Sequence, residues 1–189
     1  MNPMTQFKKI RIVPLLIALA LVALAALTAA PARATDSCGV TTVDLLFGQN
    51  PPQAAFFPDG LLDLMCRDIT GWNLKTKVKG DSDLWVTEHT YQPGGQTGWH
   101  THRGPSLITV VEGTLTVYKD DCTSTTYNAG ESFTDIGCGD VHNVVNETGA
   151  EAKDVAVQIL PHGALRREDA GDPGCPQVPA CTPTPGPRF

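Results

Sequence analysis

Basic residues are scarce in this sequence. Its 189 residues include 14 Lys and Arg against 20 Asp and Glu, so the formal net charge is −6 at pH 7. A chain with this acidic excess repels a phosphate backbone, and we therefore expect no nucleic-acid partner.

Several motifs with known chemistry are also missing. None of the six cysteines belongs to a Cys-x-x-Cys pair, which argues against a thiolate zinc site and against thioredoxin-like chemistry. No Gly-x-Ser-x-Gly elbow is present, so a serine hydrolase is not favoured, and no acid pair indicates a glycosidase. After residue 34 no stretch shows a helical period of apolar residues.

The first 34 residues carry the three-part pattern of a secretory signal peptide. Lys8, Lys9 and Arg11 form a basic start, an uncharged apolar run covers about 13–30, and Ala-Arg-Ala stands at 32–34. An uncleaved membrane anchor is the alternative, because about 18 apolar residues approach a spanning length. The small residues favour cleavage, which predicts a secreted or periplasmic bacterial protein with no membrane contact afterwards.

Removal of residues 1–34 leaves 10 basic and 20 acidic side chains, a formal charge of −10. The remaining chain of roughly 155 residues is enough for one domain. An even number of cysteines in an exported chain suggests disulfides, although six cysteines allow about 15 pairings.

The middle of the chain is a series of short runs rich in Val, Ile, Thr and aromatic residues. Gly, Pro, Asn or Asp turns close each run at intervals of about ten residues, which is typical of an all-β sandwich or barrel. The runs cover 83–91, 106–120, 124–136, 141–148 and 152–160, and a further strand is predicted over 41–47. Gly113 is placed to form a tight hairpin turn with positive φ.

Four segments follow from these patterns. Residues 1–34 are the signal peptide, 35–80 a lead-in with edge strands, 81–162 the barrel, and 163–189 a tail rich in Pro and Gly. The composition of the tail excludes a helix and indicates a surface-lying or disordered segment, fixed wherever its cysteines find partners.

Histidine occurs five times, and three histidines stand in one arrangement. His100 and His102 are two residues apart, so on a strand both imidazoles project from the same face. His142 begins a later run. Three neutral imidazoles from two strands can hold a divalent cation and leave positions open for water or substrate.

Two stretches around these histidines resemble the two motifs of the cupin family. They are GGQTGWHTHRGPSLITVVEG at 94–113 and GESFTDIGCGDVHNVVN at 130–146. The resemblance is closest to small, single-domain bacterial cupins that carry GWHxHxGP and end in a DPGxC tail. It implies a jelly-roll β-barrel, a double-stranded β-helix, with a metal inside.

The sequence departs from the family pattern at two places. The first motif normally carries a Glu that is the fourth ligand, and Ser106 stands at its position. The second motif normally has Pro-x-Gly before its His, whereas this chain has Ile-Gly-Cys at 136–138 and one extra residue. Some metal-dependent dioxygenases of the superfamily use three His and no Glu, so a metal site is still expected.

The resemblance also implies a disulfide between Cys122 and Cys175. In the cupins that this chain resembles, a cysteine after the barrel hairpin accompanies one in the DPGxC tail. The partners of the other cysteines are left open; these are Cys38, Cys66, Cys138 and Cys181.

Four further residues are candidates for the surroundings of the site. Ser106 and Asn146 are candidate hydrogen-bonding partners of the ligands, because a coordinated His usually donates its second N–H to a neighbour. His89 and Tyr91 share one face of their strand. If that face is inward, His89 is an additional ligand or an acid–base group; the alternative is a core or surface His with its hydrogen bonds satisfied.

Taken together, these patterns predict one divalent transition metal per chain, held by His100, His102 and His142. The ligands favour Zn, Fe, Cu, Ni or Mn over Ca or Mg; the alternative is a metal-free barrel whose histidines serve a ligand pocket. Two functions stay open for a monomer or homodimer with a small-molecule partner. One is dioxygenase- or isomerase-like transformation of that molecule, and the other is non-catalytic binding or sensing.

Overall fold

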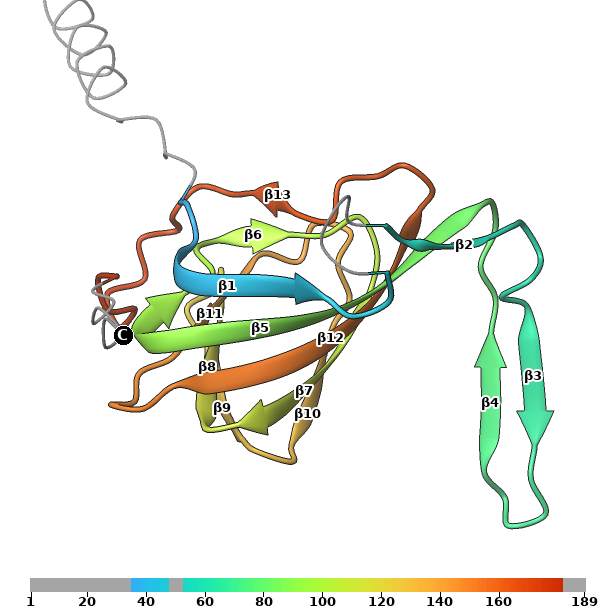
Figure 1. The fold of residues 1–189 in the computed structure, drawn as a ribbon, viewed down its shortest axis with the longest axis horizontal. Coiled ribbons are helices and arrows are strands. Elements are labelled where there is room, and N and C mark those ends of the chain that lie inside the picture. Colours follow the sequence, from blue (N-terminus) through green and yellow to red (C-terminus); the bar gives the residue numbers. More distant parts are fainter. Residues whose placement is uncertain (1–34, 48–52, 182–189) are drawn as a thin grey trace, which may run out of the picture. The chain divides into compact units, whose positions relative to one another are not determined.

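Strands make up all the regular structure in the part of the chain that the computed structural model describes, residues 35–47 and 53–181 (Figure 1). The predicted signal peptide at 1–34 and the last residues of the predicted tail, 182–189, lie outside the described residues. Among the described residues there is no helix of the length and hydropathy that a membrane span requires. The all-β prediction is confirmed.

Eleven strands form one sheet, in which every pairing is antiparallel. They are β1 (Cys38–Asp44), β2 (Ala55–Phe57), β5 (Ser82–Gln96), β6 (His100–Thr101), β7 (Ser106–Glu112), β8 (Thr114–Lys119), β9 (Ser124–Asn128), β10 (Ser132–Asp135), β11 (His142–Val145), β12 (Ala152–Pro161) and β13 (Glu168–Asp169). A separate two-stranded sheet contains β3 (Leu64–Arg67) and β4 (Asn73–Thr76).

The long strand β5 connects the two walls of the barrel. On one side it pairs with β12, which leads to β7 and β10; at its end it pairs with β11, which leads to β6 and β8. Burial alternates residue by residue along β12, as expected for a strand with one face toward the interior. The sheet therefore curls around a central space, the jelly-roll arrangement of Figure 1.

The predicted strand runs coincide with observed strands, but several boundaries differ: β5 continues to Gln96, five residues beyond the predicted end, and β11 ends at Val145, three residues before it. β7 and β8 meet at Gly113, whose φ is 72°, as the turn prediction requires. The strand predicted over 41–47 instead covers Cys38–Asp44, because pairing with β5 begins at Cys38 and the chain bends after Asp44. The sheet also takes strands from both flanking segments, β1 and β2 from the lead-in and β13 from the tail.

Two apolar clusters stabilise this barrel. The first lies between the walls and consists of Tyr91, Val110, Leu115, Val117, Val144 and Ala152. In the second, Trp99, Tyr118 and Val145 pack with Cys175 of the predicted tail. The tail is therefore part of the folded core as far as Cys175.

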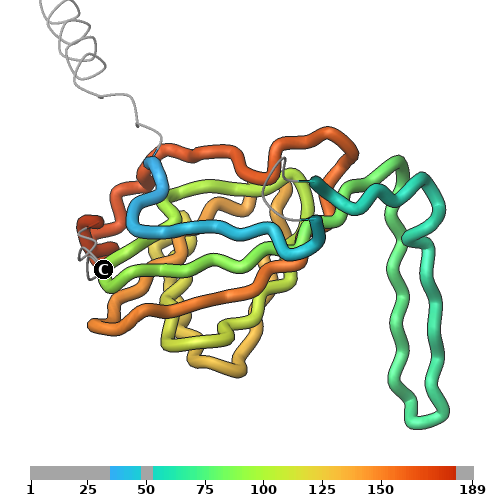
Figure 2. Tube along the Cα trace, viewed as in Figure 1, coloured from blue at the N-terminus to red at the C-terminus, as the bar shows by residue number. Residues whose placement is uncertain are grey.

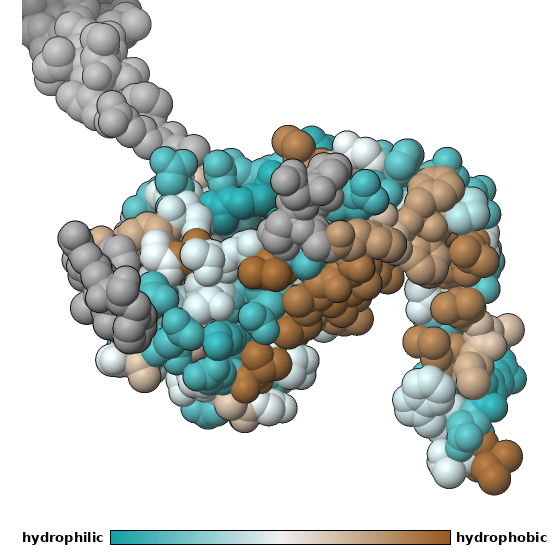
Figure 3. All heavy atoms as spheres, in the orientation of Figure 1, coloured by the Kyte–Doolittle hydropathy of each residue, from teal (hydrophilic) through white to brown (hydrophobic). Residues whose placement is uncertain are grey.

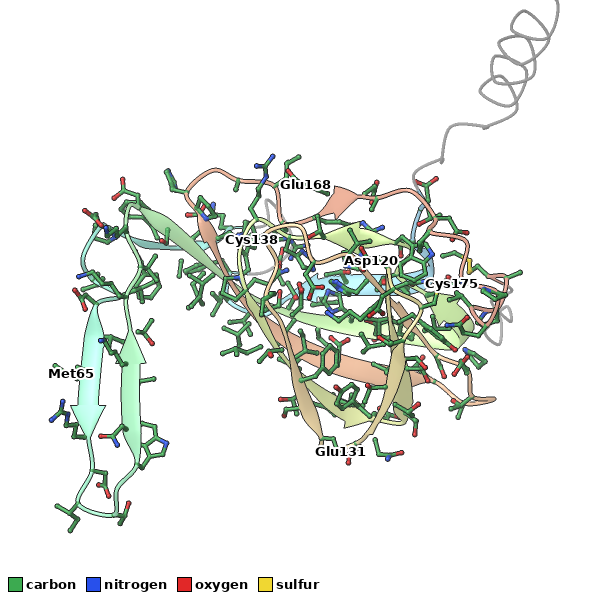
Figure 4. The ribbon with its side chains drawn as sticks, turned by 180° about the vertical axis from the view of Figure 1, so that it is seen from behind. Met65, Asp120, Glu131, Cys138, Glu168 and Cys175 are labelled. Carbon is green, nitrogen blue, oxygen red and sulfur yellow. A yellow bond between two sulfur atoms is a disulfide. The ribbon has the colours of Figure 1, made fainter. Side chains whose placement is uncertain are left out.

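Two disulfides fix both ends of the described chain. Cys122 is bonded to Cys175, the pair that the family resemblance implies, and Cys38 is bonded to Cys181. Figure 4 labels Cys175 at the end of the barrel, and Figure 2 shows the blue N-terminal strand beside the red C-terminal segment. Cys66 and Cys138 are free and exposed.

The β3–β4 hairpin is amphipathic. Cys66 and its cross-strand partner Leu74 share one face with Leu64, whereas Asp63 and Lys77 form an ion pair of 3.5 Å one position along the ladder, on the other face. Most of these side chains are exposed, and apolar residues are visible along the hairpin in Figure 3. A two-stranded hairpin of this kind is marginally stable by itself in water.

Removal of the Cys122–Cys175 disulfide should strongly destabilise the barrel. The bond closes a loop with a sequence separation of 53 residues, and the chain-entropy model gives about 4 kcal/mol for a loop of this length. We expect the double variant Cys122→Ala/Cys175→Ala to lose about that much free energy of unfolding in urea titrations. Cys66→Ala, at an exposed free cysteine, is the matched control. A double variant as stable as this control would contradict the prediction.

Candidate metal centre

The pairing of β6 with β11 brings two of the three predicted ligands together. His100 and His142 are directly opposite each other in this ladder, and their ring centroids lie 4.3 Å apart. Opposite residues in an antiparallel pair project from the same face, so both rings enter the barrel. Both side chains are buried.

His102 follows β6 and completes the cluster. Its ring centroid lies 4.9 Å from that of His100 and 5.5 Å from that of His142. The backbone N–H of Cys138 donates to the His102 carbonyl at 2.7 Å. Here the backbones of two loops are in direct contact. A Cβ on Gly137 would lie only 2.3 Å from the Gly104 carbonyl oxygen, which is too close for any side chain. Glycine is needed at 137, and the contact holds His102 in place.

Hydrogen bonds orient the three imidazole rings so that one nitrogen of each ring faces the other two rings. The Nδ1 of His100 lies 2.8 Å from the Gly98 carbonyl, and the Nδ1 of His102 contacts the Arg166 carbonyl. Because a carbonyl only accepts, each Nδ1 carries the proton and each Nε2 keeps its lone pair. At His102 the closer contact with the Arg166 carbonyl decides this, so the Gln158 amide nitrogen 3.1 Å from the same Nδ1 makes no hydrogen bond with it. His142 has a longer contact of 3.5 Å from Nδ1 to the Asp140 carbonyl. Such contacts orient imidazoles for metal binding.

Burial keeps these imidazoles neutral. It lowers the pKa of His142 to about 4 and holds the pKa of His100 well below 6.5. The pKa of His102 is also lowered, mainly by burial. Since only neutral imidazole binds a metal, all three side chains are in the ligating form at neutral pH.

The three ligating nitrogens all lie within 4.8 Å of one another. Two atoms bonded to one ion at about 2.1 Å are at most about 4.2 Å apart. That limit applies to two ligands on opposite sides of the ion; in tetrahedral geometry the distance is about 3.4 Å, so the most distant pair of nitrogens would have to approach by up to about 1.4 Å on a common ion.

A cavity of about 150 Å³ extends from the histidine cluster into the barrel. Its other polar lining residues include Thr97, Ser106, Gln158, His89, Tyr91, Asp154, Arg166 and Arg167. The apolar walls include Ile108, Phe133 and Val144. A volume near 150 Å³ is enough for about one small ring.

His89 and Tyr91, the two candidates on β5, both line this cavity and both bind Asp154. His89 is directly opposite Asp154 in the β5–β12 ladder, and its Nδ1 lies 2.7 Å from Asp154 Oδ1. The Tyr91 hydroxyl donates to Asp154 Oδ2 at 2.8 Å. Asp154 is only 2% exposed, so these two donors compensate a buried carboxylate.

The other two candidates differ in their placement. Ser106 lines the cavity and accepts a hydrogen bond of 3.2 Å from the Gln158 amide, which lies 3.1 Å from His102 Nδ1. Asn146 does not line the cavity; its amide donates to the backbone carbonyls of Tyr91, Gln92 and Ala150. Asn146 therefore supports the turn between β11 and β12 and does not hydrogen-bond to the histidines in the described structure.

Comparison with known proteins agrees with this architecture. Residues 87–157, which run from β5 to β12, match the family described as "Cupin domain". A cupin domain from Bordetella pertussis is 31% identical, and the match covers 40% of this chain and 80% of that one. This chain belongs to the cupin superfamily.

Further solved structures are similar to this cupin at lower identity. A polyketide cyclase from Streptomyces resistomycificus is 20% identical, covering 75% of this chain and 80% of that one with a TM-score of 0.48. A double-stranded β-helix protein from Klebsiella pneumoniae is 23% identical, covering 47% and 74% with a TM-score of 0.39. The TM-score with the Bordetella domain is 0.36. No curated protein is significantly similar.

Sequence reasoning missed two acids of this cupin, Asp154 and Asp135. Asp135 is 2% exposed, and its Oδ1 accepts a hydrogen bond of 2.9 Å from the Gly137 N–H. Its Oδ2 lies 3.6 Å from His102 Nε2 and is buried without a hydrogen-bond partner in the described structure. An orphaned buried carboxylate oxygen beside three imidazoles fits a metal cation. Only the alternation around Phe133 in the second motif could have indicated that Asp135 points inward.

Proposed function

We propose that this cupin binds one divalent transition-metal ion through His100, His102 and His142 and holds a small organic anion beside it. The observation that carries the proposal is the convergence of three neutral, buried imidazoles, with ligating nitrogens within 4.8 Å, at the wall of one cavity. A site rich in nitrogen favours Zn, Fe, Cu, Ni or Mn over Ca or Mg. When bound, such an ion polarises an oxygen atom of the molecule it holds.

The charges around the cavity favour an anion. Three neutral imidazoles bring no negative charge to a divalent ion, one carboxylate such as Asp135 would offset only one of its two charges, and Arg166 and Arg167 line the same cavity. Arg166 is paired with Asp44 at 3.0 Å. Asp169 and the Thr35 carbonyl hold the Arg167 guanidinium, at 2.5 and 3.2 Å. The cavity of about 150 Å³ limits the ligand to a small molecule.

His89 gives this cavity a proton acceptor. An ionised Asp154 only accepts, so the 2.7 Å contact places the imidazole proton on Nδ1 and leaves a lone pair on Nε2. The Nε2 atom lies 3.5 Å from Thr87 Oγ1, which is too long for a strong hydrogen bond. A base oriented by a buried acid is a recurring arrangement for proton transfer. Of the reaction types that the sequence leaves open, we therefore propose enolisation, an isomerase-like step.

Elemental analysis of untagged protein tests the metal centre. We expect about one transition-metal ion per chain, and occupancy below about a tenth of this in His100→Ala, His102→Ala and His142→Ala, because each variant removes a ligand. His162→Ala is the control, since His162 is exposed and pairs with Asp83 outside the cavity. Substoichiometric metal that His102→Ala does not reduce would overturn the proposal.

Replacement of His89 tests the proton transfer. Asparagine can still donate to Asp154 but has no basic nitrogen. We expect the wild-type protein loaded with Zn²⁺ to accelerate exchange of the α-protons of small 2-oxo acids in D₂O, followed by proton NMR. His89→Asn should slow this exchange by about 10²-fold or more at unchanged metal content. Absence of exchange in the wild type across the series would contradict enolisation, and equal rates in both proteins would remove His89 as the base.

We further propose that the chain is exported and cleaved after residue 34. The pattern at 1–34 and the two disulfides support an oxidising compartment. N-terminal sequencing of the protein recovered outside the cytoplasm should begin at Thr35 or within a few residues of it. A full-length chain retained in the membrane fraction would contradict this.

A further inference from the structure

We propose that Asp135 is the carboxylate ligand of this metal centre, provided from the strand next to the one on which the family motif carries its acid. The inference rests on the proposed function, because it assigns a further ligand to the same ion. It changes the expected ligand set from three imidazoles to three imidazoles and one carboxylate.

The first support is the unbalanced hydrogen bonding of Asp135. Its two oxygens are buried, and only Oδ1 has a donor, the N–H of Gly137. Asp154, the other buried acid near the histidines, has a donor on each oxygen. Burial of a charged oxygen with no partner is costly unless a cation or a donor compensates it.

The second support is the group that Asp135 faces. Its Oδ2 lies 3.6 Å from His102 Nε2, whose lone pair is directed into the barrel because Nδ1 contacts the Arg166 carbonyl. A carboxylate oxygen and an unprotonated nitrogen are both acceptors, so they repel each other when nothing lies between them. A shared cation removes this repulsion, and 3.6 Å is within the limit of about 4.2 Å for two ligands of one ion.

The third support is the strand register. Asp135 on β10 is directly opposite Ser106 on β7, the position at which the motif normally has its acid. Opposite residues project from the same face of an antiparallel pair, so Asp135 extends from the same face as residue 106. It lines a smaller cavity of about 60 Å³, which His142 shares with the first. The Ser106 hydroxyl is bound to the Gln158 amide. In this assignment the carboxylate comes from the residue directly opposite the position at which the motif has its acid.

Cobalt binding to matched variants tests the assignment. Asp135→Asn keeps an oxygen for the Gly137 N–H and removes the negative charge. We expect its Kd for Co²⁺, measured by calorimetry, to rise about tenfold or more, and the visible absorption of bound Co²⁺ to change because the carboxylate is lost. Ser106→Glu in the same chain should restore both toward wild type. Asp83→Asn, at a buried acid outside the cavity that also has a donor on each oxygen, should change neither.

The outcomes separate the ligand role from its alternatives. An unchanged Kd in Asp135→Asn overturns the inference, and so does weaker binding with an unchanged spectrum, which would make Asp135 a support of His102. If wild-type protein binds no Co²⁺, or His102→Ala binds it equally well, the metal centre itself fails. If Asp135→Asn does not fold, the number of exchangeable waters on Mn²⁺ bound to the wild-type protein, counted with ¹⁷O-labelled water, tests the assignment instead. Four protein ligands leave about two water positions in octahedral geometry. A count of about three would refute Asp135 as a ligand.

Discussion

The pairing of β6 with β11 is the contact on which the candidate site depends. β6 is two residues long, and its partnership with β11 places His100 opposite His142. So short a strand is held by its neighbours, and its other neighbour is β13, where Asp169 is opposite His100. The same C-terminal segment contributes the Arg166 carbonyl to His102 and an N–H from Ala170 to Trp99. The segment after β12 therefore belongs to the site as well as to the surface of the barrel.

The two buried acids near the histidines illustrate how a barrel interior assigns different roles to the same chemical group. Asp154 lies opposite His89 and has a donor on each oxygen, so its charge is balanced within the protein. Asp135 lies opposite Ser106, and one of its oxygens is left without a donor in the described structure. Because burial makes an unbalanced charge expensive, the difference in partners determines which acid is available to a ligand.

The parts of the fold that local patterns control could be predicted from the sequence. Alternation and turn residues indicated the strands, the spacing of two between His100 and His102 indicated a shared face, and the motif order added His142. Asp135 and Asp154 could not be found in this way, because their roles depend on cross-strand register. Asn146 shows the same limit: its position in the motif suggested a partner of the ligands, but it binds backbone carbonyls at the start of a turn. The contribution of the tail was equally hidden, since pairing between distant segments leaves no local signal.

The disulfide between Cys38 and Cys181 imposes an order on the maturation of the chain. Its two cysteines are separated by 143 residues, so in a polypeptide that emerges N-terminus first the Cys38 thiol must stay unpaired, or be released from a wrong partner, until Cys181 arrives. Cys66, Cys122 and Cys138 emerge in the meantime, and each is a competing partner for that thiol. Pairing of β1 with β5 would hold Cys38 in position until Cys181 arrives. Rapid maturation would require strand pairing to be faster than thiol–disulfide exchange, or an isomerase that reverses incorrect disulfides.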